Sequence, residues 1–287
     1  MTPQIAHRAM ELAEVVIHSA SGAAPESASW GIAVEAPVQV TLNGTPWTVV
    51  LATPCDVEDL AVGLVLTERV LTDVRSVRSV TAAEFLHDIA VDVVVPEDQI
   101  DRTALQHRSL IGNSACGLCG IESLAQLQER RTRSESGADH ASGGPQSDGP
   151  EISDSAVLAA FAALPSHQAV NRETHSMHAA AWCEPGGTIL LAREDVGRHN
   201  ALDKLIGALA RRDMLVQPGF VVLSSRCSYE LVYKASVANT RMLATISAPT
   251  SMALEWSRAL ALPIACRIGG PADGRVVHFR TEITSAR

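Results

Sequence analysis

Two cysteines separated by two residues are the part of the sequence best suited to chemistry. Cys116 and Cys119 form a Cys-Gly-Leu-Cys-Gly run ahead of a segment with helical periodicity. Asn113 or Ser114 can cap that helix, so we expect the thiols at its N-terminus. Unpaired backbone N–H groups at such a position favour negative charge, and therefore the reactive thiolate. The pair is predicted to share a proton, a sulfur atom or a metal.

The chemistry of this pair has several interpretations. A zinc site would need two further ligands, and His175 and His178 have a suitable spacing, although about 55 residues separate them from the cysteines. A zinc deaminase would need an upstream His-x-Glu or Cys-x-Glu and a proline before the first cysteine, and both are absent. A thioredoxin-like site would follow a strand directly, which the preceding run does not resemble. A sulfur carrier, in which a thiolate accepts and passes on a sulfur atom, remains alongside zinc.

Polar turns in the second half form another group of candidates. Each turn follows a short apolar segment and precedes a helical one, so each is expected at the carboxyl end of a strand, where α/β sheets bind ligands. Hydroxyls, Arg side chains and helix N-termini suit phosphate or pyrophosphate, although the same residues also cap helices. The candidates are Asp195, Arg198, His199, Ser224, Arg226, Ser228, Thr250 and Ser251.

The elements that position these turns follow from hydrophobic periodicity. Strands are predicted at 188–192, 220–223, 242–247 and 264–268, and helices at 200–210, 229–238 and 252–262. This alternation is typical of βαβ units and a mainly parallel sheet. In the first half, the pattern predicts a smaller α+β part, with two strands around Asn43-Gly44, a helix over 56–71 and a strand over 89–95.

Composition suggests how the chain is divided. Residues 131–155 are rich in Ser, Gly, Asp and Pro and predict a flexible linker. We expect a weakly ordered segment over 1–30, in which Met1–Ala20 has a weak helical pattern, an α+β part over 31–130, and an α/β cofactor-binding domain over 156–287.

Charge and cysteine usage limit the class of protein. A net charge of −9 argues against general binding of nucleic acid or membranes, and no apolar run has the length to span a bilayer. Six dispersed cysteines and the lack of a signal-peptide pattern predict a cytoplasmic protein. The isolated cysteines Cys55, Cys183, Cys227 and Cys266 are expected to pack in the core, although Cys227 also lies in one of the polar turns.

Several segments share a pattern with one family. They are Asn43-Gly44, 58–63, 116–120, 178–181, 194–204, 224–230, Lys234 and 247–251. Together these segments resemble the formate dehydrogenase accessory sulfurtransferase family, the FdhD-type sulfur carriers, over most of the chain from about residue 37.

The resemblance implies a function and a fold. Members of the family accept a persulfide sulfur from a cysteine desulfurase and deliver it to the bis-molybdopterin guanine dinucleotide cofactor of formate dehydrogenase. By position, Cys116 is the persulfide-bearing residue and Cys119 its partner. The resemblance also implies a cytidine-deaminase-like larger domain, a homodimer and no structural metal. The alternative interpretation is a zinc-stabilised nucleotide-binding module without sulfur chemistry.

The resemblance places one more cofactor-binding segment near the last predicted strand. It comprises Cys266, Arg267, Ile268, Gly269, Gly270 and Pro271. The family usually has Phe where this chain has Cys266, which would remove stacking on the guanine. The chain also departs from the family pattern at Ser225, where glycine is usual, and at 175–177, which contains no glycine.

Overall fold

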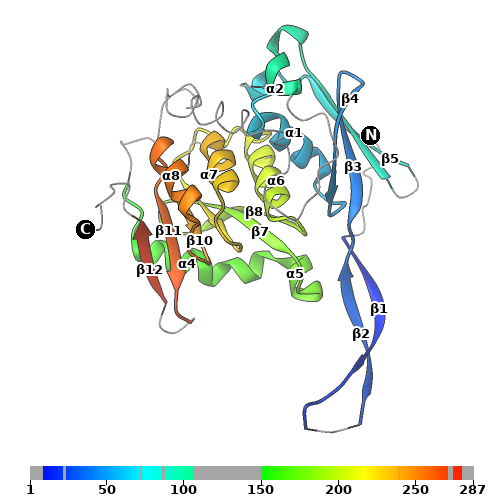
Figure 1. Ribbon diagram of the computed structural model, residues 1–287, viewed down its shortest axis with the longest axis vertical. Helices are drawn as coiled ribbons and strands as arrows, with labels where there is room; N and C mark the ends of the chain where they lie inside the picture. The colour runs from blue at the N-terminus through cyan, green and yellow to red at the C-terminus, as the bar shows by residue number, and fades with distance from the viewer. Residues whose placement is uncertain are drawn as a thin grey trace.

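The computed structural model describes residues 9–21, 24–71, 73–85, 88–106, 150–238, 240–270 and 274–279. A four-stranded sheet and a six-stranded sheet lie on either side of a pair of helices, and a two-stranded ribbon extends beyond them (Figure 1). The fold is mixed α/β, as expected at that coarse level.

The first half contains the ribbon and the smaller sheet. Its elements are β1 (Met10–Ile17), β2 (Glu26–Ala33), β3 (Ala36–Leu42), β4 (Thr45–Ala52), α1 (Val57–Thr67), β5 (Ser79–Phe85), β6 (Asp88–Val94) and α2 (Arg102–Gln106), with 3-10 turns at Val74–Ser76 and Glu97–Gln99. The smaller sheet has the order β4-β3-β6-β5. The predicted hairpin is confirmed, because Asn43 and Gly44 have positive φ angles of 51° and 76° between β3 and β4.

The ribbon contradicts one expectation for the N-terminus. Strands β1 and β2 pair antiparallel along their whole length, from Met10 opposite Ala33 to Ile17 opposite Glu26. The weak helical pattern expected within Met1–Ala20 is therefore wrong over β1. Strand formation agrees with the local sequence, because Val15, Val16 and Ile17 are β-branched and favour extended backbone.

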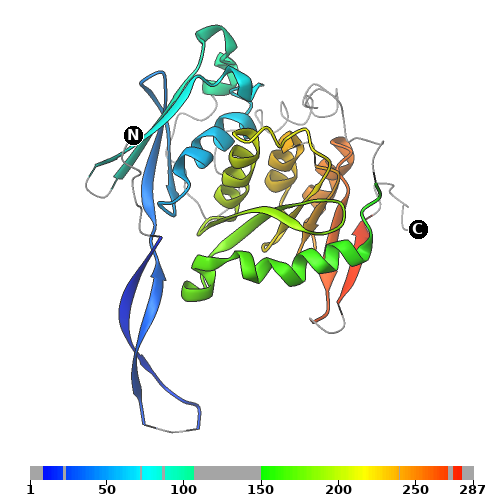
Figure 2. The same ribbon diagram turned by 180° about the vertical axis from the view of Figure 1, so that it is seen from behind.

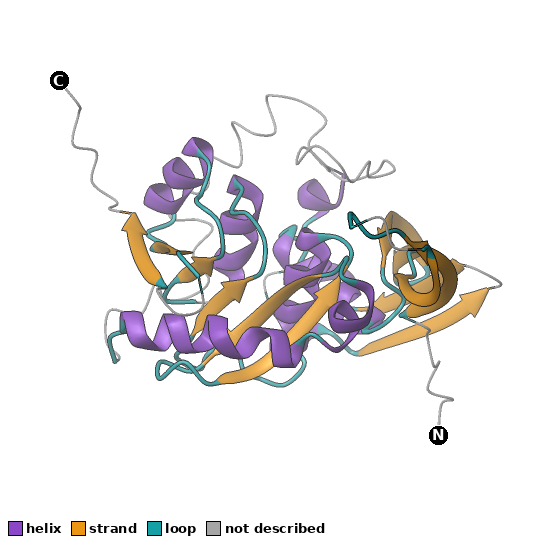
Figure 3. Ribbon diagram, turned by 90° about the horizontal axis from the view of Figure 1, so that it is seen from below, coloured by secondary structure: helices purple, strands orange, loops and turns teal. Residues whose placement is uncertain are grey.

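The second half builds the larger sheet. Its elements are α4 (Asp154–Ala163), α5 (Ala169–Thr174), β7 (His178–Cys183), β8 (Ile189–Asp195), α6 (Arg198–Ala210), β9 (Phe220–Leu223), α7 (Tyr229–Ala235), β10 (Leu243–Thr245), α8 (Ser251–Ala259), β11 (Ile264–Ile268) and β12 (Arg275–Phe279), with 3-10 turns at Leu164–His167 and Ser236–Ala238. The larger sheet has the order β12-β11-β10-β9-β7-β8. Helix α4 lies on one face of this sheet, and α6, α7 and α8 lie on the other (Figures 2 and 3).

The expectation of a mainly parallel sheet is wrong. Only the pairs β9–β10 and β10–β11 are parallel among the described neighbours, and the other pairs are antiparallel. The reason is two strands that the sequence pattern did not predict. Strand β12 pairs antiparallel with β11, and a short turn at Glu184–Thr188 joins β7 to β8 as a hairpin. Because β7 lies antiparallel to both β8 and β9, strands β8, β9, β10 and β11 still point the same way.

Helices α1 and α6 cross with their backbones almost in contact, which joins the two halves of the chain. A Cβ atom added at Gly63 would lie 1.8 Å from the carbonyl oxygen of Asp203, and one at Gly207 would lie 1.8 Å from that of Asp59. Around the crossing, Leu60 and Leu205 belong to one buried core that includes residues of both sheets. Glycine at these two positions therefore permits the close approach.

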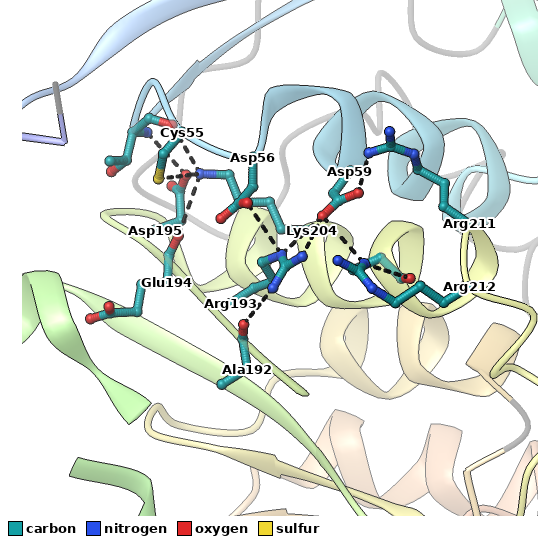
Figure 4. A network of polar contacts seen from close by, with 12 residues as sticks. Cys55, Asp56, Asp59, Ala192, Arg193, Glu194, Asp195, Lys204, Arg211 and Arg212 are labelled. Carbon is teal, nitrogen blue, oxygen red and sulfur yellow. Dashed lines mark hydrogen bonds and ion pairs between the residues drawn. The ribbon is translucent and has the colours of Figure 1, made fainter. Parts of the chain in front are cut away.

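Buried ion pairs surround this crossing. Asp59 on α1 accepts hydrogen bonds from Arg193 Nη2 on β8, at 2.7 Å, and from Arg211 after α6 (Figure 4). On another side, Lys234 Nζ of α7 lies 2.9 Å from Glu68 Oε1 and 3.0 Å from Asp203 Oδ1. Apart from the exposed Arg211, these charges are paired and largely removed from water, so loss of one buried partner would leave the other uncompensated. Within the described ranges, none of the helices is both long and apolar enough to span a bilayer.

The close crossing makes a prediction about stability. Gly63→Ala would place its methyl group against the Asp203 carbonyl, so helix α1 or α6 must shift, and we expect the free energy of unfolding to fall by about 3 kcal/mol. Gly186→Ala is the control, because its nearest non-neighbouring atom would be 4.0 Å away, and we expect a change below about 0.5 kcal/mol. Urea titration monitored by circular dichroism measures both. A Gly63→Ala protein as stable as the control would contradict the close contact.

Candidate cationic site at the turn edge

Polar turns from four strands meet at one edge of the larger sheet. Because β8, β9, β10 and β11 run in the same direction, the residues that follow them lie at the same edge. We call this the turn edge; it comprises His178 at the start of β7 and residues 195–199, 224–228, 247–251 and 267–270. The predicted position of the turns at carboxyl ends is thus confirmed, although the sheet is not mainly parallel.

The turn edge concentrates positive charge around His178. Burial is the largest cause that lowers the pKa of the His178 imidazole. Its neighbours Arg198, His199 and Arg226 lower this pKa further, and Asp195 opposes them. In the part of the chain that the structure describes, Nε of Arg198 is buried without a hydrogen-bond acceptor. Arg226 is exposed. A donor without an acceptor, beside other cations, fits an anionic ligand.

His199 connects two of the turns. It is the second residue of α6, and its Nε2 lies 2.9 Å from Glu230 Oε2 and 3.4 Å from Ser228 Oγ, both at the start of α7. Glu230 is buried, so its carboxylate faces the histidine rather than solvent. Sequence reasoning quoted Glu230 only as part of a matching segment and gave it no role. The sequence offered one signal for a role of Glu230, namely a carboxylate placed directly after a Ser-rich turn.

Asp195 serves the structure rather than an open site. Its carboxylate is fully buried, lies 2.6 Å from Lys204 Nζ, and accepts hydrogen bonds from the backbone N–H groups of Thr53 and Gly197 (Figure 4). Lys204 also donates to the Thr53 carbonyl oxygen, at 2.9 Å. Asp195 was predicted to bind the cofactor, but the structure uses it to hold the start of α6 against the end of β4. Contacts between residues about 140 positions apart cannot be read from one sequence.

Some of the predicted hydroxyl ligands are hydrogen-bonded to nearby backbone, and others are at least partly exposed. Ser224 Oγ accepts a hydrogen bond from the Ala179 N–H, at 2.7 Å, and Thr250 Oγ1 accepts one from the Ala253 N–H, at 3.2 Å, as the N-cap of α8. Thr250 therefore also has the capping role that was the alternative interpretation, whereas Ser224 ties its turn to strand β7. Ser251 is exposed in the first turn of α8, and Ser228 is half-buried as the N-cap residue of α7.

The segment at the end of β11 reaches the same edge. Cys266 lies inside the sheet, with 2% of its surface exposed, so its side chain packs in the core rather than at the turn edge. Arg267 is half-buried, and Ile268 and Gly269 are exposed. Gly269 has a φ angle of 86°, which favours glycine and turns the chain at the edge. Gly270 completes the described part of this segment, and Pro271 lies outside it.

The described cysteines are poor nucleophiles, as the sequence predicted. Burial raises the pKa of Cys183 and of Cys227 to about 12 and also raises that of Cys266. Cys55 is half-buried with its Sγ 3.9 Å from Lys204 Nζ, and its pKa is raised because burial outweighs the nearby ammonium. Each thiol therefore favours its neutral form near neutral pH.

Cys116 and Cys119 lie outside the described residues, as does most of the predicted linker. The possible zinc ligand His175 is exposed, and its ring lies 5.4 Å from that of Trp30 on the ribbon. Among the residues that the structure places, no three His, Cys, Asp or Glu side chains form a group able to hold a metal.

Comparisons with known proteins identify the family. The fold and the turn edge define a mixed α/β protein with a cationic edge on its larger sheet. The FdhD/NarQ family model matches residues 33–274, and the chain therefore belongs to this family.

Individual relatives agree with this family. The chain is 39% identical over 247 residues to a sulfur carrier protein FdhD of Variovorax paradoxus, an alignment that covers 86% of this chain and 84% of the relative. It is 37% identical to that of Burkholderia mallei, covering 91% and 94% respectively. A crystal structure described as a putative formate dehydrogenase accessory protein from Desulfotalea psychrophila has the same fold, with a TM-score of 0.67, 16% identity and coverage of 94% and 96%.

The charges around His178 predict its titration. Burial and neighbouring cations disfavour the imidazolium form, so the midpoint of His178 in an NMR titration should lie below 6.5. Arg198→Gln removes one positive charge and should raise this midpoint, and bound pyrophosphate should raise it as well. Arg212→Gln, which alters a cation beside Asp59, should leave it unchanged. A midpoint unaffected by Arg198→Gln would contradict the proposed arrangement of charges.

Proposed function

We propose that this chain is a sulfur carrier that supports the activity of formate dehydrogenase. The main support is that the chain belongs to the FdhD/NarQ family over residues 33–274 and is close to 40% identical to relatives named sulfur carrier proteins. The related structure from Desulfotalea psychrophila is described as a formate dehydrogenase accessory protein, which agrees with the same client.

In the proposed transfer, Cys116 accepts a sulfur atom from a cysteine desulfurase. The Cys116 thiolate attacks the terminal sulfur of the donor's cysteine persulfide, a new S–S bond forms on Cys116, and the donor cysteine leaves as a thiolate. Cys119 takes part in transfer or release. The high pKa values of Cys183 and Cys227 make them poor competitors, which supports assigning the reaction to the Cys-x-x-Cys pair.

The turn edge is proposed to bind the bis-molybdopterin guanine dinucleotide cofactor, the recipient of the sulfur. The unpaired Nε of Arg198 and the exposed guanidinium of Arg226 fit its phosphate groups, and His199, beside Glu230, lies at the same edge. The exposed Ser251 and the half-buried Arg267 extend this surface along the edge. The cofactor supplies the metal that receives the sulfur, whereas these side chains bind and orient it.

Other properties expected from the family resemblance or from composition are also proposals. They are a cytidine-deaminase-like arrangement of the larger domain, a homodimer, a cytoplasmic location, and the absence of a structural metal, of nucleic-acid binding and of membrane association. The net charge of −9 supports the last two of these.

A cysteine substitution tests the proposed function. Cys116→Ala removes the sulfur acceptor, so activation of sulfur-free formate dehydrogenase in a reconstituted assay should fall at least about a hundredfold, by analogy with loss of a covalent nucleophile. Circular dichroism should show the same fold as the wild type.

Cys183→Ala is the matched control. It removes a buried thiol whose pKa is about 12, outside the turn edge, and should retain activation, provided that the protein still folds. Full activation by the Cys116→Ala protein would refute the carrier assignment.

A further inference from the structure

The ribbon formed by β1 and β2 exposes apolar side chains that no described element covers. Of the twelve large hydrophobic side chains that are exposed in the described residues, five lie in this ribbon. They are Leu12, Val16, Ile17, Trp30 and Ile32, with exposures between 41% and 71%. By the register of the two strands, Leu12 and Val16 lie on one face, and Ile17, Trp30 and Ile32 lie on the other. A two-stranded ribbon is marginally stable by itself in water, so apolar residues exposed on both of its faces indicate that a partner covers it in a complex.

The ribbon is also uniformly acidic. Residues 9–33 contain Glu11, Glu14 and Glu26 and no Lys or Arg, and all three glutamates are exposed. Glu11 and Glu26 lie near opposite ends of the paired strands, because Glu11 pairs with Ile32 and Ile17 pairs with Glu26. A surface complementary to the ribbon therefore combines apolar side chains with Lys or Arg. Two ribbons facing each other would repel, which disfavours a second copy of the chain in that arrangement.

The base of the ribbon is close to the turn edge. Gly31 of β2 packs against the backbone of Glu173 at the end of α5, where an added Cβ would lie 2.7 Å from the carbonyl oxygen. The start of α5 is held by Glu194 at the end of β8, whose carboxylate accepts hydrogen bonds from the N–H groups of Val170 and Asn171, at 3.0 and 2.8 Å. In Figure 1 the ribbon leaves the body of the protein on the side where β11 ends.

We propose that the ribbon is the docking arm for formate dehydrogenase, which binds it through an apolar surface that carries Lys or Arg. A protein bound along the ribbon is adjacent to the turn edge and can receive the cofactor from it. This inference rests on the proposed function, because it assumes that the turn edge holds the cofactor for delivery.

Two pairs of substitutions separate the apolar and the charged contributions. Leu12→Thr with Val16→Thr removes apolar area while it keeps a high β-propensity, and Phe85→Thr with Val216→Thr is the control at exposed sites outside the ribbon. Glu11→Gln with Glu14→Gln removes two charges, and Glu151→Gln is the control at an exposed glutamate elsewhere. The full chain is used throughout, and circular dichroism checks its fold.

The measurement is binding to purified formate dehydrogenase that lacks its cofactor, together with the concentration of carrier that gives half-maximal activation. For the Leu12/Val16 variant, we expect the affinity to fall and the concentration for half-maximal activation to rise, each by at least about tenfold. The control variants should match the wild type. We expect the Glu11/Glu14 variant to weaken binding in 50 mM salt, by a factor that shrinks in 300 mM salt because ions screen the attraction.

Ribbon variants that bind and activate within twofold of the wild type would overturn the docking role while leaving the carrier function intact. A wild-type dimer that becomes monomeric in these variants, measured by sedimentation, would assign the ribbon to a second copy. Loss of sulfur loading by the desulfurase with normal client binding would assign it to the donor. Both results overturn the proposal. If the wild type neither binds nor activates formate dehydrogenase, the proposed function itself fails.

Discussion

The close crossing of α1 and α6 is the constraint on which the other features depend. Gly63 and Gly207 let the two backbones approach, and no larger residue fits without moving a helix. The crossing fixes α6 against α1, which packs on the smaller sheet, and α6 begins with Arg198 and His199 of the turn edge. Packing in the middle of α6 thus sets the position of Arg198 and His199 at its N-terminus. The core is continuous through this contact, so the two halves support each other.

The buried charges make that arrangement specific. Asp195 with Lys204 anchors the β8–α6 turn to Thr53, and Asp203 with Lys234 connects α6 to α7. Paired buried charges contribute little net stability, but an altered register would leave them unpaired at a cost of several kcal/mol. The polar block 194–204 therefore has two functions. Most of its charged residues hold elements together, and Arg198 and His199 remain at the turn edge.

Sequence patterns predicted local structure better than long-range structure. Strands β9 and β11 were predicted at their observed bounds, because each is a short apolar run between polar turns. Strand β7 was missed, since Ala179, Ala180 and Ala181 favour helix locally and become a strand only between β8 and β9. The turn edge was predicted from residue types after strands, whereas the roles of Asp195 and Glu230 depend on contacts that spacing does not reveal.

The most direct test of the account is whether sulfur is carried on Cys116. Intact-protein mass spectrometry after incubation with a cysteine desulfurase and L-cysteine would measure this in the wild type and in the Cys116→Ala and Cys119→Ala variants. The account predicts a gain of one sulfur atom that reductant removes, that maps to Cys116, and that is lost in the Cys116→Ala protein. No added sulfur, under conditions that load an established carrier, would contradict it.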